Sequence, residues 1–449
     1  MFHRLLIANR GEVAVRIARA ARELGIAPIG VASTADKDAS WLENMEEVVV
    51  LGPAASKHSY LSRERLLQAA LQTHATALHP GWGFLAEDAR FAALCGQHGV
   101  KFVGPQPALI ASMGLKTPAK RAMRAAGLDV IPGSDGPLED LDEARRVAEE
   151  AGYPVLIKAD AGGGGRGMRR VDTPDELEEA YNATRAEAEG AFGSAAVYLE
   201  KFLVGGRHIE VQVVSDAFGN AIHLGERDCS IQRRHQKLIE ESPSPVLTPE
   251  ERAELGRRSA EATRNLGYQN AGTIEYLRAA DGSIYFMEMN TRLQVEHPVT
   301  ELVTGIDLAR LQLEVAANRP LGITQEDVRF EGHAIECRIN AEDPHDDFRP
   351  TPGRLTAFEI PADRGPGQVR IDTHLRAGDE VSPHYDSLLA KVIASGRDRT
   401  EAIATMSAAL SHARIEGVST TIPLHLAVLA SPEFASHDYD TTALPGWQG

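Results

Sequence analysis

The segment Met287-Glu-Met-Asn-Thr-Arg-Leu-Gln-Val-Glu-His-Pro-Val-Thr-Glu301 carries a polar side chain at every second position from Glu288 to Glu296. Such alternation is typical of a strand with one buried face and one wet face. The polar face here holds two carboxylates, two amides and a guanidinium, which is more chemistry than solubility requires. We therefore interpret the segment as part of a site, against the alternative of an amphipathic edge strand.

Two runs of β-branched and aromatic residues flank the dipeptide Asp281-Gly282, which is a strong hairpin signal. A two-residue turn at this dipeptide would place Glu275 directly opposite Glu288. Carboxylates that face each other on paired strands lie roughly 5 Å apart and repel, so a cation is expected between them. Oxygen ligands, with an amide at Asn290, favour Mg²⁺ or Mn²⁺ shared with phosphate oxygens.

The whole chain has the composition of an ordinary globular protein. Its 449 residues suggest two or three domains, with 43% apolar and 25% charged residues. The net charge of −17 argues against a general nucleic-acid binder or a membrane-surface binder. Three scattered cysteines predict neither a disulfide framework nor a zinc site, and they favour a reducing cytoplasm. The first residues already follow a strand pattern, so no signal peptide is expected, and no apolar run reaches membrane-spanning length.

The first hundred residues alternate between strand-like and helical patterns, which predicts a parallel sheet with crossover helices. The turn Asn9-Arg10-Gly11-Glu12 has one glycine and therefore lacks the dinucleotide fingerprint. The expected strands are 5–8, 29–32, 47–51, 77–79 and 101–103, and the expected helices are 13–24 and 63–72.

A turn-rich stretch near residues 125–137 marks the entry to a second unit. Two strands are expected in 208–224, around a turn at 216–220, and one helix is expected over 302–317. A last unit begins near residue 332, with strands at 334–339 and 353–360 and a final helix near 401–412.

A glycine run occupies residues 162–167, between strand-like segments at 155–158 and 168–171. A dinucleotide fingerprint needs a strand followed by a helix, and Met168 stands where a P-loop needs lysine. The run is therefore either a linker or hairpin tip, or a flap whose backbone N–H groups close over phosphates. The carboxylate site downstream favours the flap, with Lys158 as a phosphate partner.

Two further polar segments have open interpretations. Residues 227–237 hold four basic side chains and His235, which indicates either a solvated basic loop or a nucleotide and anion site. Glu200-Lys-Phe-Leu203 follows an expected strand and offers groups suited to an adenine edge.

Together these motifs resemble the ATP-grasp ligases and, more narrowly, the biotin carboxylases. The resemblance runs through Leu6–Glu12, His79-Pro-Gly-Trp-Gly-Phe84, 158–168, 226–237, Met287–Glu301 and Glu336-Cys-Arg-Ile-Asn-Ala-Glu-Asp343, and covers essentially the full chain. Long ungapped motifs in the family order are far more specific than a lone glycine pattern.

The resemblance implies a role for each matching residue. The implied ATP-binding residues are Lys116, Lys158, Gly164, Gly165, Glu200, Lys201, Leu203, His208, Gln232, His235, Glu275 and Glu288. The implied metal ligands are Glu275, Glu288 and Asn290. The implied bicarbonate and biotin site consists of Lys237, Arg292, Gln294, the Val295 backbone and Arg338. Glu296 is the implied catalytic base, assisted by Arg292, Arg338 and Lys237.

The implied fold is α/β and α+β in three domains. A Rossmann-like pre-ATP-grasp domain is expected over 1–115, and an ATP-grasp domain over 116–331, with a mobile glycine-rich lid at about 131–203. A mixed α/β C-terminal domain is expected over 332–449.

The implied reaction is the carboxylation of biotin with ATP and bicarbonate, through carboxyphosphate, giving carboxybiotin, ADP and phosphate. It is the first half-reaction of an acetyl-CoA or acyl-CoA carboxylase, which implies a role in fatty acid biosynthesis. The resemblance also implies Mg²⁺ or Mn²⁺ at two sites, a homodimer, a biotin carboxyl carrier protein or domain, and carboxyltransferase subunits as partners. No nucleic acid or membrane partner is expected.

A few positions depart from the family pattern. Trp82 stands where a tyrosine is common, near the expected biotin pocket, and Ala161 replaces a glycine at the start of the flap. Met-Lys-Met does not occur, so we expect the substrate to be biotin on a separate carrier. Two alternatives remain: an ATP-grasp ligase that joins a carboxylate to an amine, and a non-catalytic nucleotide-binding scaffold. Residues 292–296 and Arg338 argue against the first, because an amine ligase has no need of that anion site and base. Retention of Glu275, Glu288, Arg292 and Glu296 together argues against the second.

The length of the Met287–Glu301 segment also limits how it can fold. Fully extended, residues 288–296 would span about 26 Å, which is too far for one reacting centre. We therefore expect the strand to end near Asn290 and residues 292–296 to bend back as a loop.

Overall fold

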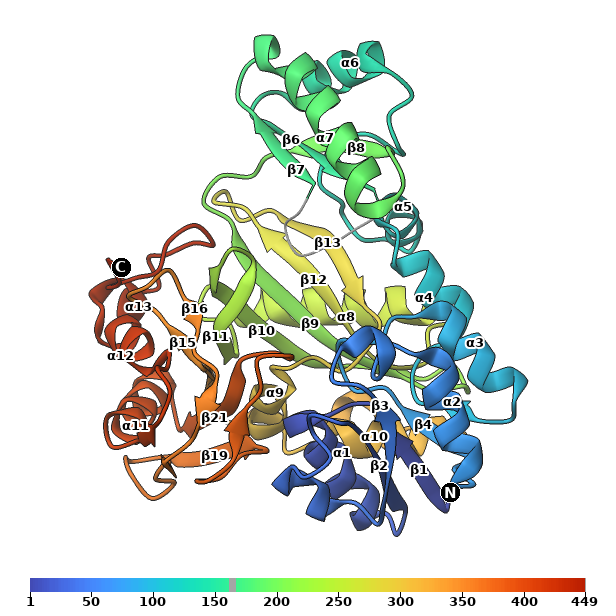
Figure 1. Cartoon of the computed structure of the whole chain (residues 1–449). Helices are drawn as coiled ribbons and strands as arrows, with labels where there is room; N and C mark the ends of the chain where they lie inside the picture. The colour runs from blue at the N-terminus through green and yellow to red at the C-terminus, as the bar shows by residue number, and fades with distance from the viewer. Residues whose placement is uncertain (161–166, 449) are drawn as a thin grey trace.

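A computed structural model describes residues 1–160 and 167–448. The N-terminal unit is a parallel sheet in the order β3-β2-β1-β4-β5, with helices packed around it (Figure 1, blue). This confirms the expected parallel sheet. Its strands are β1 (Arg4–Ile7), β2 (Ala27–Ser33), β3 (Glu47–Gly52), β4 (Ala77–His79) and β5 (Lys101–Phe102). Its helices are α1 (Gly11–Glu23), α2 (Arg63–Gln72), α3 (Ala89–Gln97) and α4 (Pro107–Met113).

A small unit projects from the body of the molecule at the top of Figure 1. It is reached through α5 (Lys116–Ala125) and contains an antiparallel sheet in the order β7-β6-β8 with its own apolar core. Its elements are α6 (Leu141–Ala151), β6 (Val155–Ala159), β7 (Met168–Val171), α7 (Leu177–Phe192) and β8 (Val197–Lys201). Most of the expected glycine flap, including Gly164 and Gly165, lies outside the described residues.

An antiparallel sheet in the order β13-β12-β9-β10-β11-β14-β21-β19 forms the centre of the molecule. It continues without a break across residue 332, where the last unit was expected to begin. Its strands are β9 (Arg207–Ser215), β10 (Ala221–Arg233), β11 (Gln236–Ser242), β12 (Asn270–Arg278), β13 (Ile284–Asn290), β14 (His333–Asn340), β19 (Gln368–Thr373) and β21 (Leu388–Gly396).

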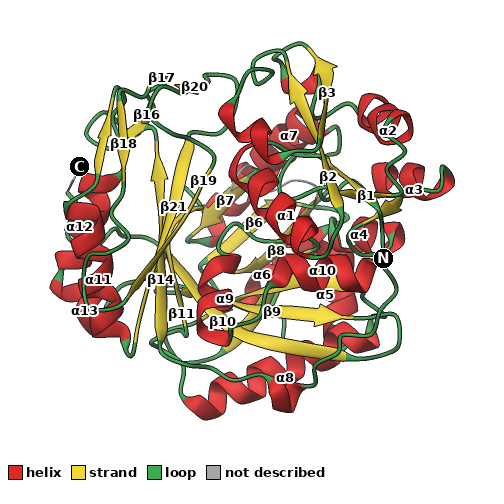
Figure 2. Cartoon of the chain, turned by 90° about the horizontal axis from the view of Figure 1, so that it is seen from below, coloured by secondary structure: helices red, strands yellow, loops and turns green. Residues whose placement is uncertain are grey.

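Helices lie on both sides of this sheet (Figure 2), and small ladders complete the C-terminal part. The helices are α8 (Pro249–Asn265), α9 (His297–Thr304), α10 (Leu308–Ala316), α11 (Arg399–Ser411), α12 (Ile422–Ala430) and α13 (Pro432–Ser436). The short paired strands are β15 (Glu342–Asp343) with β16 (Arg349–Pro350), β17 (Gly353–Arg354) with β20 (Glu380–Val381), and β18 (Ala357–Glu359) with β22 (Arg414–Glu416).

Several sequence-based expectations are wrong in detail. The strand expected over 353–360 is two short strands, β17 and β18. The helix expected over 302–317 is two helices, because Gly305 adopts a left-handed conformation and ends α9. The helix expected to be the last, α11, is followed by α12 and α13. Of the two interpretations left open for residues 227–237, the solvated loop does not hold. These residues are the facing ends of β10 and β11, joined by a turn with positive φ at Arg234 and His235.

Strand β9 shows how the sheet separates the core from the site. Its odd-numbered residues Ile209, Val211 and Val213 pack in a core shared with α8 residues such as Leu255 and Ala262. Successive side chains of a strand point to opposite faces, so His208, Glu210 and Gln212 lie on the other face. One face of the sheet is therefore an apolar core, and the other collects polar groups.

Candidate active site

A row of charged residues crosses four adjacent strands on the polar face. Glu288 pairs with Glu275, Glu275 pairs with Glu210, and Glu210 pairs with Arg227. The expected opposition of Glu275 and Glu288 is confirmed. Residues in directly opposed positions share a face, so three carboxylates lie side by side beside one guanidinium.

Lys237 joins this row to the end of the Met287–Glu301 segment. Its Nζ donates to Glu210 at 2.6 Å, to Glu275 at 2.9 Å and to Glu296 at 2.6 Å. Burial would lower the pKa of Lys237, but the three carboxylates raise it well above its usual range. Strand β13 ends at Asn290 and Glu296 precedes α9, so the expected bend is confirmed. Lys237 connects Glu296 to Glu275, the strand partner of Glu288.

Glu296 is fully buried between two cations. Its Oε1 accepts from Lys237, and its Oε2 accepts from Arg338 Nη2 at 2.9 Å. Burial alone would raise the pKa of Glu296, but Lys237, Arg338 and Arg227 hold it well below its usual range. Glu296 is therefore an ionised carboxylate at neutral pH.

Arg338 has a second carboxylate partner, Glu240 on β11, which accepts from its Nε at 2.6 Å. Glu240 pairs across the sheet with Glu336, and both are fully buried. Burial, opposed by Arg338, raises the pKa of Glu240 to about 7. The guanidinium is thus fixed from two sides.

The loop between Asn290 and Glu296 is held from the N-terminal unit. Arg292 Nε donates to Glu87 at 2.8 Å, and the Thr291 backbone N–H donates to the same carboxylate at 3.1 Å. Gln294 is buried, and its Nε2 has no hydrogen-bond partner among the described residues. A buried amide donor without a partner is costly, which is consistent with a site for a bound acceptor.

The expected metal ligands already hold cations. Lys116 Nζ lies 3.1 Å from Glu288, and Lys237 lies against Glu275. Asn290 donates its amide to Glu275 at 2.8 Å, while its carbonyl oxygen accepts from Arg292 at 3.0 Å. The donor set, two carboxylates and an amide oxygen, fits Mg²⁺ or Mn²⁺, and the two lysines show that positive charge is stable there.

The expected nucleotide residues fall into two groups. In the first, buried Glu200 accepts from Lys158 and from Lys120, the latter at 3.2 Å, and these lysines lower the pKa of Glu200 against the effect of burial. Lys201 Nζ is engaged by the backbone carbonyls of Gly152 and Tyr153. Leu203 is half-buried beyond the end of β8.

The second group lies beside the carboxylate row. His208 Nε2 is 3.2 Å from Glu275, and although burial would lower the pKa of His208, this carboxylate raises it. Gln232 is buried near the end of β10, opposite Lys237. His235 is exposed in the turn.

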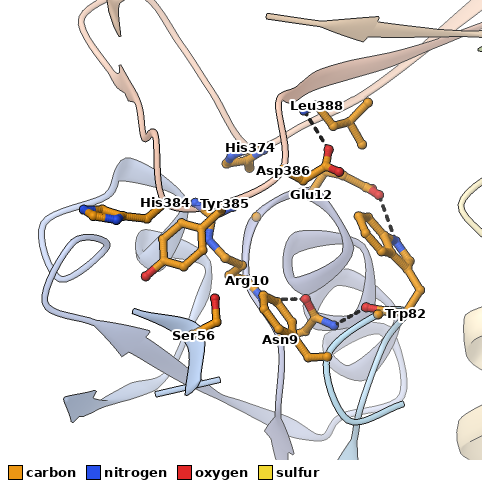
Figure 3. Close-up of a pocket in the computed structure, with 13 residues that line it drawn as sticks. Asn9, Arg10, Glu12, Ser56, Trp82, His374, His384, Tyr385, Asp386 and Leu388 are labelled. Carbon is orange, nitrogen blue, oxygen red and sulfur yellow. Dashed lines mark hydrogen bonds between the residues drawn. The ribbon is translucent and has the colours of Figure 1, made fainter. Parts of the chain in front are cut away.

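A cavity of about 340 Å³ lies where the N-terminal loops meet the segment before β21 (Figure 3). Trp82 forms part of its wall and donates its indole N–H to Glu12 at 3.3 Å. Tyr385 lies across the cavity, with the Arg10 guanidinium 4.2 Å from the centre of its ring.

Several residues of the site were not predicted from the sequence. They are Glu12, Glu87, Lys120, Glu210, Glu240 and Lys391. A signal existed for Glu210, because His208, Glu210 and Gln212 alternate with apolar residues as the opening segment does. The partners of the others lie on distant segments, so no local pattern marks them.

Three family models match the chain in succession. They are described as biotin carboxylase, N-terminal domain (residues 1–110), carbamoyl-phosphate synthase L chain, ATP binding domain (116–324), and biotin carboxylase C-terminal domain (336–445).

A relative from Bacillus subtilis matches over nearly the whole chain. This protein, biotin carboxylase 1, is 51% identical over 445 residues, covering 99% of this chain and 98% of its own.

Two solved structures match over a similar length. One is the biotin carboxylase domain dimer of the 2-oxoglutarate carboxylase from Hydrogenobacter thermophilus, in complex with magnesium ADP, ADP and bicarbonate. Its TM-score is 0.93 at 45% identity, with 98% of this chain and 96% of the other covered. The other is the biotin carboxylase component of a pyruvate carboxylase, with a TM-score of 0.84 at 47% identity and coverage of 98% and 97%. The three-domain fold is therefore the same.

Proposed function

The chain belongs to the biotin carboxylase family, and from this premise we propose how its own residues carry out the ATP- and bicarbonate-dependent carboxylation of biotin. The observation that carries the proposal is the shared contact of Lys237 with Glu275 and Glu296. It brings the metal-side carboxylate and the base to one ammonium. One transferred phosphoryl group can therefore be in reach of both.

Glu296 acts as the general base toward bicarbonate. Bicarbonate is a poor nucleophile, so removal of its proton by the carboxylate assists attack on the γ-phosphorus of ATP. At rest, the cations at Glu296 keep its pKa low, and an incoming bicarbonate competes for Lys237 and Arg338. This competition raises the basicity of Glu296 when substrate is bound.

Arg292, Gln294 and the Val295 backbone hold bicarbonate. The unpartnered Nε2 of buried Gln294 supplies a donor, and Arg292 supplies charge. Glu87 restrains Arg292 from the N-terminal unit, which preorganises the guanidinium.

Glu275, Glu288 and Asn290 would hold two divalent cations, which neutralise charge on the phosphates of ATP. Lys116 and Lys158 bind phosphate oxygens, and Gly164 and Gly165 complete the nucleotide site. Glu200, Lys201 and Leu203 contact the adenine, while His208, Gln232 and His235 line the remaining nucleotide surface. Lys120 supports Glu200 in this role.

Arg338 stabilises biotin in the second step. Carboxyphosphate breaks down to CO₂ and phosphate, and the phosphate takes the N1 proton of biotin. Negative charge then develops on the ureido oxygen, where a guanidinium held by Glu240 and Glu296 stabilises it. The deprotonated N1 attacks the CO₂, and the new N–C bond gives carboxybiotin.

We further propose that the substrate is biotin on a separate carrier protein, that carboxyltransferase subunits use the product, and that the chain forms a homodimer. The similar proteins include components of a pyruvate carboxylase and of a 2-oxoglutarate carboxylase, beside a biotin carboxylase. We favour an acyl-CoA carboxylase, with a cytoplasmic location. The three cysteines are buried and free, as a reducing compartment favours. No helix within 1–160 or 167–448 is long and apolar enough to span a membrane.

The first test measures ADP release from ATP, with and without bicarbonate and with and without free biotin. The second measures transfer of labelled carbon from bicarbonate to biotin. ADP release should require bicarbonate, and labelled carboxybiotin should form. Turnover that ignores biotin and needs an amine would contradict the proposal. The acceptor is tested separately, by adding carrier and carboxyltransferase and comparing acetyl-CoA with pyruvate.

A further inference from the structure

Lys391 is a fully buried lysine at the centre of β21. Its Nζ donates to the Val295 carbonyl at 2.8 Å and lies 3.3 Å from Glu12 and 3.9 Å from Asp372. Burial would lower the pKa of Lys391, but Glu12, Glu336 and Asp372 raise it above its usual value against the opposing effect of Arg370. The charged ammonium therefore donates a hydrogen bond to a carbonyl of the 292–296 loop, which we propose binds bicarbonate.

The position of this carbonyl matters for the base. The Val295 carbonyl belongs to the peptide group that leads directly into Glu296. A peptide unit is planar, so fixing its oxygen also restricts the backbone on which the Glu296 side chain is mounted. Charge-assisted hydrogen bonds in a buried site are among the stronger and more directional ones.

Glu12, the carboxylate partner of Lys391, also lines the cavity. Glu12 lies at the start of α1 and accepts from the Trp82 indole at the cavity wall (Figure 3). Consecutive polar contacts therefore connect Trp82 to Glu12, Glu12 to Lys391, and Lys391 to the Val295 carbonyl. They link the N-terminal unit, β21 and the loop before α9.

A second anchor holds the middle of α9. Glu301 accepts from Arg16 of α1 and from Arg370 of β19, each at 2.7 Å. Arg370 in turn is paired with Asp372 at 2.6 Å. The loop before α9 and the helix itself are thus both tied to the N-terminal unit and to the C-terminal strands of the sheet, which restricts movement of Glu296 at the helix N-terminus.

We propose that Lys391 is a positioning residue of the reaction: it holds the Val295 carbonyl so that Glu296 and the bicarbonate-binding loop keep their working geometry. Glu12 and Trp82 support it from the cavity wall. This inference rests on the proposed function, since it assumes that bicarbonate binds to the 292–296 loop. It gives a role to three residues outside the proposed catalytic set.

The experiment compares Lys391→Met, which removes the ammonium but keeps a long apolar chain, with the wild type. We expect the KM for bicarbonate to rise or kcat to fall by about tenfold or more, with the KM for ATP changed by less than about twofold. A merely structural role would change both KM values or only the melting temperature. Lys101→Met, an exposed lysine at β5, is the matched control and should leave all parameters unchanged.

Two milder variants keep the test decisive if Lys391→Met does not fold. Trp82→Phe deletes the indole N–H and keeps a ring, and Glu12→Gln keeps an acceptor but removes the charge. Each should raise the KM for bicarbonate by about twofold to fivefold, with Glu12→Gln the larger. An unchanged KM and kcat for bicarbonate in every folded variant would overturn the inference. Loss of bicarbonate-dependent ADP release in the wild type would instead refute the proposed function.

Discussion

At the scale of single residues, the site depends on charges that neutralise one another. Lys237 bonds three carboxylates, and Glu296 bonds two cations. Buried charges are tolerated only when they are paired in this way. Two of the substrates that we propose, ATP and bicarbonate, are anions, and they would replace carboxylates as partners of these cations.

Replacing Glu296 with glutamine tests the base. The amide cannot accept the bicarbonate proton, so kcat should fall by about a hundredfold or more. The measurement is bicarbonate-dependent ADP release. Glu261→Gln, at an exposed position on α8, should retain full activity. A Glu296→Gln protein with the wild-type rate would remove Glu296 from its proposed role.

Replacing Glu288 with glutamine tests the metal ligands. Loss of one carboxylate should raise the Mg²⁺ concentration for half-maximal activity by about tenfold or more. A titration of activity against Mg²⁺ at saturating ATP measures this value. Glu275→Gln should have a larger effect, because buried Glu275 also holds Lys237 and His208. Unchanged Mg²⁺ titrations in both variants would show that these carboxylates are not ligands.

At the scale of elements, the β12–β13 hairpin has the predicted pairing of Glu275 with Glu288, but its turn differs from the predicted one. The predicted two-residue turn at Asp281-Gly282 is wrong, because Ala279 and Ser283 close a three-residue loop. Arg278 therefore pairs with Ile284, one residue out of the predicted register. An irregularity at Met287, between the Tyr276 and Glu275 pairs, restores the register, so Glu275 still faces Glu288.

Two glycine replacements should have opposite effects on stability. Gly282 closes this loop at φ +90°, which an alanine adopts only with strain, so Gly282→Ala should destabilise the protein by about 1 kcal/mol. Gly190 lies in helix α7 with open space around it, so Gly190→Ala should stabilise by about 0.5–1 kcal/mol. Denaturant unfolding measures both. Equal effects would show that backbone conformation does not decide the outcome.

At the scale of the whole molecule, Glu241 of β11 ties the C-terminal elements to the central sheet. Its carboxylate accepts from His333 of β14 at 2.7 Å, from Arg399 of α11 at 2.6 Å and from Tyr439 at 2.9 Å. Burial would raise the pKa of Glu241, but His333 and Arg399 lower it from 4.5 to about 2. The ionised form is therefore more stable in the folded protein than in the unfolded chain.

This shift predicts a pH dependence of stability. A lowered pKa adds stability that is fully present above the unfolded value of 4.5 and is lost as the pH falls toward about 2. The contribution is roughly 3 kcal/mol. Urea unfolding from pH 6 to 3 should show that Glu241→Gln costs most at the high end and progressively less toward acid. A constant difference between variant and wild type would contradict this.

Local patterns in the sequence were sufficient for several parts of the molecule. The alternation of strand and helix patterns predicted the parallel N-terminal sheet. The polar alternation and the span of 288–296 predicted the strand end at Asn290 and the bend toward Glu296. These features depend on residues close together in the chain, where side-chain periodicity reports directly on the backbone. Helix boundaries such as Gly305 were missed, since a glycine alone does not decide between tolerance and termination.

The tertiary structure decided which distant groups complete the site. Glu87 and Arg292 are 205 residues apart in the chain, and Lys391 and Val295 are 96 apart. Their contacts depend on strand order and on how the N-terminal unit packs against the central sheet, which no local period encodes. The sequence by itself therefore determined the residue types and local geometry of the half-sites around Glu288 and Glu296. Only the tertiary structure brought Lys237, Arg338 and Lys391 around them. Buried charges must be paired, and these pairs join segments that are far apart in the chain and meet only in the folded protein.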